Sequence, residues 1–467
     1  MSKNTKTLLI LLVGVCIWFA PVPEGLSVKA LHLFAIITAT ILGYILQPVP
    51  MGAIGITAVA VCVLTKTTTL AEALSGYSNS TIWLVVSAIL FARGFINSGL
   101  GTRIAYLLIQ KLGSSSIKLG YAILLSDLII APATPSNTAR AGGILFPIVR
   151  SLSSAFSSEP NTESRKKLGA YLTQTLYQSV VVTSMMFITA IASNSLVVTF
   201  AKQVSDIELS WFTWALAAIV PGGICLAVLP LLMHKLYPPE IKETSAAKEI
   251  ARQELAKLGP MSRNEKCIAA VFSIALILWA TTQWTGLNAT LVAILSVVSI
   301  IWLGAMPYKE AAKESMAWDN LLWMGTLIGL AGLLVKFGFI KWLAELISTS
   351  LTGVSWIAAL YALAAAYILS HYFFAATSSH VTAMYAAFLT VAISAGAPPY
   401  YAALFLGFSS VLCAGLTHYG MGPAPVLFGP NYVTQKEWWG LGLTFAVFNA
   451  LIWFGIGPIW WKFIGLW

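Results

Sequence analysis

The sequence predicts an all-α polytopic membrane protein with about 11 transmembrane helices, arranged as two inverted repeats. Of its 467 residues, 58% are hydrophobic and only 9% are charged. This composition leaves too little polar surface to enclose a soluble core. Two short polar stretches, residues 135–140 and 377–380, interrupt the apolar pattern at similar places in the two halves. They are the best candidates for a binding site.

The chain opens with several candidate membrane spans. The apolar run of residues 8–21 follows two lysines, but no small-residue cleavage site comes after it, so we interpret it as a retained span rather than a signal peptide. Residues 30–46 and 54–64 predict two more spans. Arg93 and Arg103 interrupt the next apolar segment. Part of that segment is therefore expected to lie along the membrane interface.

The first polar stretch lies at the tip of a predicted re-entrant hairpin. Two apolar arms, residues 117–131 and 141–149, are each short for a span and meet at a proline-rich turn. The turn carries Ser136, Asn137 and Thr138. Such a tip is tolerated at membrane depth only where its backbone faces protein or a water-filled cavity.

Each half is also expected to contain a broken helix. Residues 168–202 are apolar but carry Ser193 and Asn194 at their centre. In the second half, polar residues including Thr417, His418 and Gly420 separate two apolar segments. In many transporters, half-helices that end at membrane depth direct their free backbone N–H and C=O groups into a cavity.

The second half repeats the landmarks of the first. Offsets of 238, 240, 239 and 242 residues relate four pairs in the same order: Glu72 and Glu310, Trp83 and Trp323, Gly99 and Gly338, and Ser136 and Ser378. Composition alone could align one pair of apolar segments, but four ordered landmarks favour an internal repeat.

Loop charge gives the orientation of the repeats. The loop after the first hairpin holds three basic residues at 165–167, whereas residues 395–401 after the second hold no charge. The first hairpin should open to the cytoplasm and the second to the outside, which makes the repeats inverted. The linker at 237–266 is then cytoplasmic. We expect a multi-pass protein of the cell inner membrane, with a cytoplasmic N-terminus and an external C-terminus.

These features together are typical of a secondary transporter that binds an anion. Helices that begin at the tips direct backbone N–H groups and positive dipole ends into the cavity. Arg140, on the first turn of the returning arm, adds a fixed charge that fits a carboxylate, and His380 corresponds to it in the second half. Asp127 is the candidate partner that orients Arg140. The predicted substrate-binding residues are Ser136, Asn137, Thr138, Arg140, Ser193, Asn194, Ser378, Ser379, His380, Thr417, His418 and Gly420.

The first motif also has a purely structural interpretation, because Ser-Asn-Thr after proline is most often an ordinary turn. The neighbouring Arg140 argues against it, since a charge at membrane depth costs several kcal/mol unless it is paired or functional. The net charge of +10 belongs mostly to loops, so no nucleic-acid partner is predicted. No cofactor and no metal site are predicted either.

The stretch from Ser126 to Gly143, with Pro135-Ser136-Asn137-Thr138 at its centre, resembles the divalent anion:sodium symporter (DASS) superfamily. The resemblance is closest to its exchanger branch, the bacterial citrate and tartrate/succinate antiporters and the plastid 2-oxoglutarate/malate translocators. It implies a homodimer in which a scaffold holds a moving, elevator-type transport domain. The implied units are scaffold helices at 1–113 and 267–352, transport-domain segments at 114–236 and 353–467, and the linker at 237–266.

The second motif departs from that family's pattern. In the sodium-coupled relatives both halves carry Ser-Asn-Thr, and nearby groups hold sodium. Here the second half reads Ser378, Ser379 and His380. Arg140 and His380 would then take the place of the cations. Because Arg140 cannot leave or deprotonate, an empty carrier would have to move an unpaired charge. This reasoning predicts obligatory, sodium-independent exchange of dicarboxylates of the 2-oxoglutarate, succinate, malate and fumarate type; small di- or tricarboxylates are the candidate partners.

Three alternatives remain open from the sequence. A sodium- or proton-coupled dicarboxylate or citrate symporter of the same fold differs only in its coupling. An intramembrane enzyme would need a set such as Asp127, His371, His380 and His418, but no HExxH or paired-carboxylate spacing supports it. A channel is a further possibility, although hairpins with a fixed Arg suit a cycle of binding and release better than a continuous pore.

Overall fold

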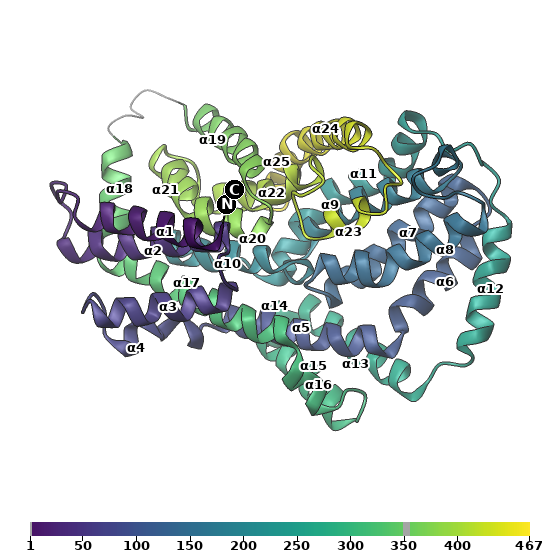
Figure 1. Ribbon diagram of the computed structural model, residues 1–467, viewed down its shortest axis with the longest axis horizontal. Helices are drawn as coiled ribbons and strands as arrows, with labels where there is room; N and C mark the ends of the chain where they lie inside the picture. The colour runs from purple at the N-terminus through teal and green to yellow at the C-terminus, as the bar shows by residue number, and fades with distance from the viewer. Residues whose placement is uncertain (1, 349–354) are drawn as a thin grey trace.

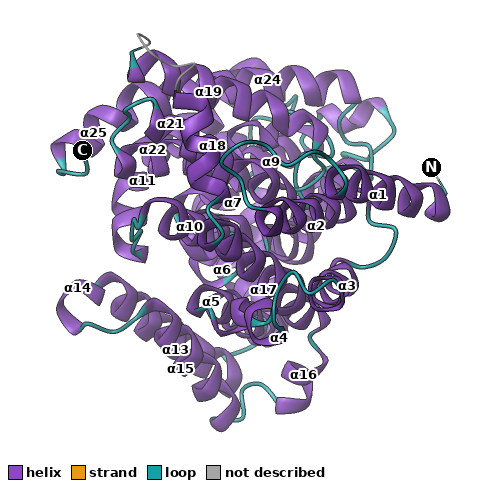
Figure 2. Cartoon of the chain, turned by 90° about the vertical axis from the view of Figure 1, so that its left-hand side faces the viewer, coloured by secondary structure: helices purple, strands orange, loops and turns teal. Residues whose placement is uncertain are grey.

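The computed structural model describes residues 2–348 and 355–467. These residues fold almost entirely into helices, and the β structure among them is an isolated bridge between Ser115 and Glu243 (Figure 2). Seven of the described helices are long and apolar enough to cross a membrane. The boundary expected at 352/353 lies outside the described residues.

The helices of the first half are α1 (Lys3–Trp18), α2 (Val28–Leu46), α3 (Met51–Leu64), α4 (Leu70–Ala73), α5 (Ser80–Ser98), α6 (Leu100–Leu112), α7 (Ser116–Ile130), α8 (Phe146–Ala155), α9 (Gly169–Met186), α10 (Ala192–Ser205) and α11 (Trp211–Leu236). The linker holds α12 (Ala246–Leu258).

The second half contains α13 (Arg263–Ala280), α14 (Thr282–Thr285), α15 (Ala289–Trp302), α16 (Tyr308–Lys313), α17 (Ser315–Lys336), α18 (Phe339–Ser348), α19 (Trp356–Ser370), α20 (Thr377–His380), α21 (Ala386–Ser394), α22 (Pro399–Leu412), α23 (Pro423–Phe428), α24 (Gln435–Leu451) and α25 (Gly457–Phe463). Besides the seven long apolar helices, the described residues include three shorter apolar helices, α3, α15 and α22.

Both predicted hairpins are present. In the first, α7 descends to a turn at 131–138, and a π-helical turn at Ala139–Leu145 leads into α8. In the second, α19 descends to a turn, and α20 with a π-helical turn at Val381–Tyr385 leads into α21. The two hairpins open toward opposite ends of the molecule, the first toward α12 and the second toward α18 (Figure 1). The repeats are therefore inverted.

Both broken helices are present as well. A short turn at Ile188–Ala190 separates α9 from α10, and residues 413–422 separate α22 from α23. The segment around Arg93 and Arg103 is divided at Gly99, whose φ is +81°. Gly338 has the same φ of +81° between α17 and α18. Glycine suits both positions because left-handed backbone is strained for other residues.

The structural register of the repeat is 240 residues at the hairpins. The descending arms begin at Ser116 and Trp356, and the 3-10 turns that end them begin at Ala131 and His371. The sequence pairing of Ser136 with Ser378, at 242 residues, is therefore wrong. In the 240 register Asn137 corresponds to Thr377 and Arg140 to His380, as the matching bonds Arg140 N–H to Ser136 O and His380 N–H to Ala376 O also indicate.

Reciprocal ion pairs join the two halves. Glu72 on α4 accepts from Nζ of Lys336 at the end of α17, at 2.8 Å. In return, Glu310 on α16 accepts from Arg93 on α5, at 3.4 Å. The hydrogen bond from Lys336 lowers the pKa of Glu72 to about 2, so this pair is ionised at neutral pH.

Two of the elements predicted to be cytoplasmic, the loop after the first hairpin and the linker, lie together. The loop after the first hairpin bonds to the linker through Lys166 O and Lys167 O, which accept from Glu240 and Ile241 N–H. Arg165 in that loop binds Glu437 at 2.8 Å, ahead of the last span. This clustering agrees with the positive-inside assignment of these elements.

Candidate functional site

The first hairpin tip is held by its own residues and by both broken helices. The Ser136 hydroxyl accepts from Ala139 N–H at 3.2 Å and so caps the returning helix. Asn137 Nδ2 donates to Ser184 Oγ at 3.5 Å, at the end of α9. A Cβ on Gly422, in the break of the second broken helix, would collide with Oγ1 of Thr138. The tip therefore lies where the two breaks meet.

Arg140 occupies a cage of oxygens beneath this tip. Its side chain is 0% exposed. Nε donates to Oδ1 of Asp127 at 2.5 Å, and Nη1 donates to Thr134 O at 3.1 Å and Ala190 O at 3.2 Å. Nη2 contacts Oγ1 of Thr183 at 3.2 Å and Oγ of Ser184 at 3.4 Å.

These contacts use all five guanidinium donors. Arg140 therefore offers none to a substrate in this conformation, which differs from its predicted role as a direct carboxylate ligand. The expectation of an unpaired charge in the empty carrier is wrong, because Asp127 neutralises Arg140 within the protein. The predicted role of Asp127 as the partner of Arg140 is confirmed.

Asp127 is itself fully enclosed. Its side chain is 0% exposed, and its second oxygen accepts a hydrogen bond from the Thr183 hydroxyl. A buried ion pair is favourable only when further hydrogen bonds satisfy its remaining groups. That condition is met here, because the hairpin and the first broken helix supply further hydrogen bonds to both members of the pair.

The second hairpin tip contacts the first broken helix. Ser193 Oγ donates to Oγ1 of Thr377 at 3.3 Å. In the structural register Thr377 matches Asn137, which likewise contacts a serine near that break. Ser378 is half-buried and Ser379 is buried beside Thr377. Each hairpin thus approaches a polar break at its tip.

The second half replaces the ion pair with neutral rings. His380 is 0% exposed, and its ring centroid lies 4.3 Å from that of Tyr367. At an offset of 240, Tyr367 takes the place of Asp127 and His380 that of Arg140. Tyr367 hydroxyl shares a hydrogen bond with Ser410 at 2.9 Å, as Asp127 does with Thr183. Among the described residues no carboxylate pairs with His380, so the structure does not support a fixed cation there.

The polar residues of the breaks have mainly structural contacts. Asn194 Nδ2 donates to Ser184 O at 2.7 Å and Phe187 O at 2.8 Å, and so joins the two parts of the first broken helix. Gly420 O accepts from His371 Nε2 at 2.7 Å. His418 Nδ1 accepts from Trp439 Nε1 at 3.0 Å, and its ring packs against Phe428.

Sequence reasoning omitted several residues that the structure brings to the site. Thr377 belonged to the polar stretch but not to the predicted binding set, and Thr183, Ser184 and His371 were not in that set either. Thr183 and Ser184 directly precede the break in the first broken helix. A search for hydroxyl residues next to helix breaks would have found them.

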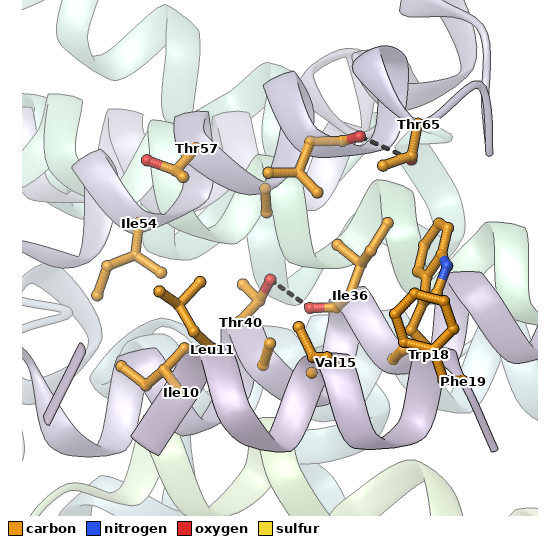
Figure 3. Close-up of a pocket in the computed structure, with 15 residues that line it drawn as sticks. Ile10, Leu11, Val15, Trp18, Phe19, Ile36, Thr40, Ile54, Thr57 and Thr65 are labelled. Atoms are coloured by element: carbon orange, nitrogen blue, oxygen red, sulfur yellow. Dashed lines mark hydrogen bonds between the residues drawn. The ribbon is translucent and has the colours of Figure 1, made fainter. Parts of the chain in front are cut away.

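A cavity of about 380 Å³ between α1, α2 and α3 does not suit a carboxylate. Its lining is apolar, with side chains such as Ile10, Leu11 and Ile36 (Figure 3). Thr40 donates to Ile36 O at 2.7 Å, and the other two lining threonines also donate to carbonyls of their own helix. These three hydroxyls are therefore engaged within their own helices, and the rest of the lining is apolar apart from the indole N–H of Trp18.

The described residues contain no group of three or more His, Cys, Asp or Glu side chains that could hold a metal ion. The two hairpin tips are rich in polar groups. Their hydroxyls, amides and helix N-termini are hydrogen-bond donors, which suit an oxyanion.

Comparison with known proteins agrees with this architecture. The family model described as "Sodium:sulfate symporter transmembrane region" matches residues 1–467. "Dicarboxylate transporter 1, chloroplastic" of Spinacia oleracea is 44% identical over 98% of this chain and 81% of that protein. "Inner membrane protein YbhI" of Escherichia coli is 39% identical over 100% of this chain and 99% of that protein.

A solved structure shares the fold. The Alcanivorax borkumensis YdaH transporter superposes with a TM-score of 0.59 at 12% identity, and the match covers 99% of this chain and 98% of that one. The family match, which spans the whole chain, fits the paired hairpins and broken helices seen here. The chain therefore belongs to the divalent anion:sodium symporter superfamily and is a multi-pass membrane transporter rather than an enzyme.

Proposed function

We propose that this protein exchanges dicarboxylates across the membrane without sodium, by an elevator mechanism. The observation that carries the proposal is the oxygen cage filled by Arg140. Five oxygens converge on its guanidinium, which holds the position a bound cation would need and cannot dissociate. The relative named a chloroplast dicarboxylate transporter, at 44% identity, supports the substrate class.

The substrate would lie between the hairpin tips and the helix breaks. Asn137 and Thr138 from one tip, and Thr377 and Ser378 from the other, would donate to its carboxylates. Arg140 would act as a positioning residue, because it ties the first tip to the first broken helix. A dicarboxylate would place one carboxylate toward each hairpin, where the donors of that tip would bind it.

In this proposal, obligatory exchange results from the hydrogen-bond donors at the hairpin tips and not from the charge of Arg140. Moving an empty site past the scaffold would desolvate several tip donors at about 1–3 kcal/mol each. A few such donors would slow the empty return about a hundredfold or more. A bound dicarboxylate satisfies them, so the loaded carrier moves readily.

A polar cavity supports movement between two units. It has a volume of about 500 Å³ and is lined on one side by the starts of α5 and α15 and on the other by α10 and the start of α11. The first pair belongs to the proposed scaffold and the second to the proposed transport domain. Loose polar packing at this boundary suits sliding better than a continuous apolar core would. We also propose a homodimer with the N-terminus cytoplasmic and the C-terminus outside.

A sodium-coupled symporter is the competing candidate. Two buried oxygens, Oγ1 of Thr134 and Oδ1 of Asn194, lack a hydrogen-bond partner. Acceptors without a donor are the kind of group that a residual sodium ion would use. The dependence of transport on sodium is therefore the property that distinguishes the two candidates.

The test is uptake of radiolabelled succinate into proteoliposomes, empty or preloaded with unlabelled 2-oxoglutarate, each with and without sodium. We expect uptake only into preloaded vesicles and no effect of sodium. Arg140→Ala should abolish it. Sodium-driven uptake into empty vesicles would overturn the proposal and favour the symporter.

A further inference from the structure

The second hairpin lies in a stretch without fixed charges. Residues 346–435 contain no Asp, Glu, Lys or Arg, yet three of the five histidines of the chain occur there, His371, His380 and His418. Any positive charge that this stretch itself supplies to balance a dianion must therefore come from a histidine. The first hairpin offers no net charge either, because Asp127 neutralises Arg140.

Two of these histidines form a buried pair. His371 is 3% exposed and His380 is 0% exposed. Their ring centroids lie 4.9 Å apart in a T-shaped arrangement. His371 ends the descending arm of the hairpin, and His380 directly follows the polar tip at Thr377–Ser379.

Hydrogen bonds determine which ring nitrogens carry protons. The Ser370 hydroxyl lies 2.7 Å from Tyr367 O and 2.9 Å from His380 Nε2; with its one hydrogen donated to Tyr367 O, it accepts from His380 Nε2–H. Gly420 O can only accept, so His371 Nε2 is also protonated. In both neutral rings Nδ1 therefore carries the lone pair, and neither buried Nδ1 has a hydrogen-bond partner.

We propose that the His371–His380 pair takes up one shared proton when a dicarboxylate binds. Each bare Nδ1 can accept a proton without breaking an existing hydrogen bond. Burial disfavours an isolated charge in the pair, whereas a dianion held by the adjacent tip favours a positive one. The proton would thus join the site with the substrate. This inference rests on the proposed dicarboxylate function and adds a charge-balancing role to the same site.

Among the described residues, the charged groups on elements packed against the pair are engaged elsewhere. Tyrosines lie in the hairpin and the second break, and a phenol is ordinarily neutral at pH 7; they include Tyr367, Tyr372, Tyr385 and Tyr419. The basic groups on the helices packed against α20 are engaged elsewhere: Lys29 over Phe337, His32 against Trp18, and Lys202 with Asp206 and Glu208. His418 is excluded from the pair because its Nδ1 already accepts from Trp439.

Calorimetric titration of the purified protein with succinate, in two buffers of different ionisation enthalpy, tests this directly. The dependence of the observed enthalpy on the buffer gives the number of protons taken up. We expect about one proton per succinate at about pH 6, and less at about pH 8. His371→Gln and His380→Gln should each reduce the uptake, and the double variant should abolish it. His32→Gln, on α2, is the matched control and should keep the wild-type value.

The outcomes separate the two proposals. Succinate binding whose enthalpy is the same in both buffers overturns the proton inference and leaves dicarboxylate transport intact. Wild-type proton uptake in a double variant that still binds succinate overturns it as well. Failure of the wild-type protein to bind any dicarboxylate overturns both proposals. If the double variant does not bind succinate, the proton inference is decided by whether the binding enthalpy of the wild-type protein depends on the buffer.

Discussion

At the scale of single residues, the Asp127–Arg140 pair should be the most sensitive point of the molecule. In Asp127→Asn, Arg140 would stay buried without a countercharge, which lowers the free energy of unfolding by about 3–5 kcal/mol. Thermal or denaturant unfolding in detergent measures the loss. Glu310→Gln is the matched control, because its 38% exposed side chain pairs with a half-exposed Arg93, and such pairs contribute at most about 1 kcal/mol.

The double variant Asp127→Asn/Arg140→Gln distinguishes the effect of an unpaired buried charge from the effect of changing the side chains themselves. Removing both charges should restore most of the stability while exchange stays lost, because the hairpin tip loses its tie to the first broken helix. Equal instability of the single and double variants would show that the ion pair is not what Asp127→Asn disturbs.

A second residue-level prediction concerns the contact between tip and break. In Gly422→Ala the new methyl group would collide with Oγ1 of Thr138 and displace the tip. A shift of this kind lowers exchange about a hundredfold, with folding largely kept. Proteoliposome exchange and thermal stability should be measured together. Gly440→Ala, where a Cβ meets no atom within 4 Å, is the control and should exchange normally.

At the scale of elements, the two glycine breaks provide a matched pair. Gly99 and Gly338 both have φ of +81°, and a Cβ at either meets no atom within 4 Å. Alanine would therefore add backbone strain alone, about 1–2 kcal/mol in each case. Unfolding of Gly99→Ala and Gly338→Ala should show similar losses. A loss at only one position would contradict the structural equivalence of the two breaks.

Most of these elements could be predicted from sequence, because prolines and polar residues interrupt long apolar runs at the hairpins and breaks. The environment of Arg140 could not. Two of its partners are the backbone carbonyls of Thr134 and Ala190, and any residue supplies a carbonyl. The repeat register inferred from the sequence was also wrong. Ser136 and Ser378 are chemically alike, but Ser378 lies two residues beyond the position that is structurally equivalent to Ser136.

At the scale of the whole molecule, the elevator proposal predicts that one cross-link stops transport. Gln203 Nε2 on α10 donates to Ile328 O on α17 at 3.0 Å, across the proposed boundary between the transport domain and the scaffold. In a variant without native cysteines, oxidised Gln203→Cys/Ile328→Cys should lose exchange and regain it on reduction.

A cross-link inside the scaffold is the control. A Cβ on Gly14 would lie 3.1 Å from that of Ala39, close to the separation of about 3.8 Å in a disulfide. Oxidised Gly14→Cys/Ala39→Cys should exchange normally. Full exchange by the oxidised Gln203–Ile328 pair would argue against an elevator movement at this boundary.

The reciprocal ion pairs of Glu72 with Lys336 and of Glu310 with Arg93 have a consequence for how the molecule can diverge. Each half supplies the cation for the other half's glutamate, as two antiparallel copies of one ancestral chain would. Two separate identical copies would be forced to carry the same hairpin. Fusion into one chain removes that constraint, so that one hairpin holds the pair Asp127–Arg140 while the other holds Tyr367 and His380. In the proposed transporter, a substrate held between the two hairpins would therefore meet two chemically different ends.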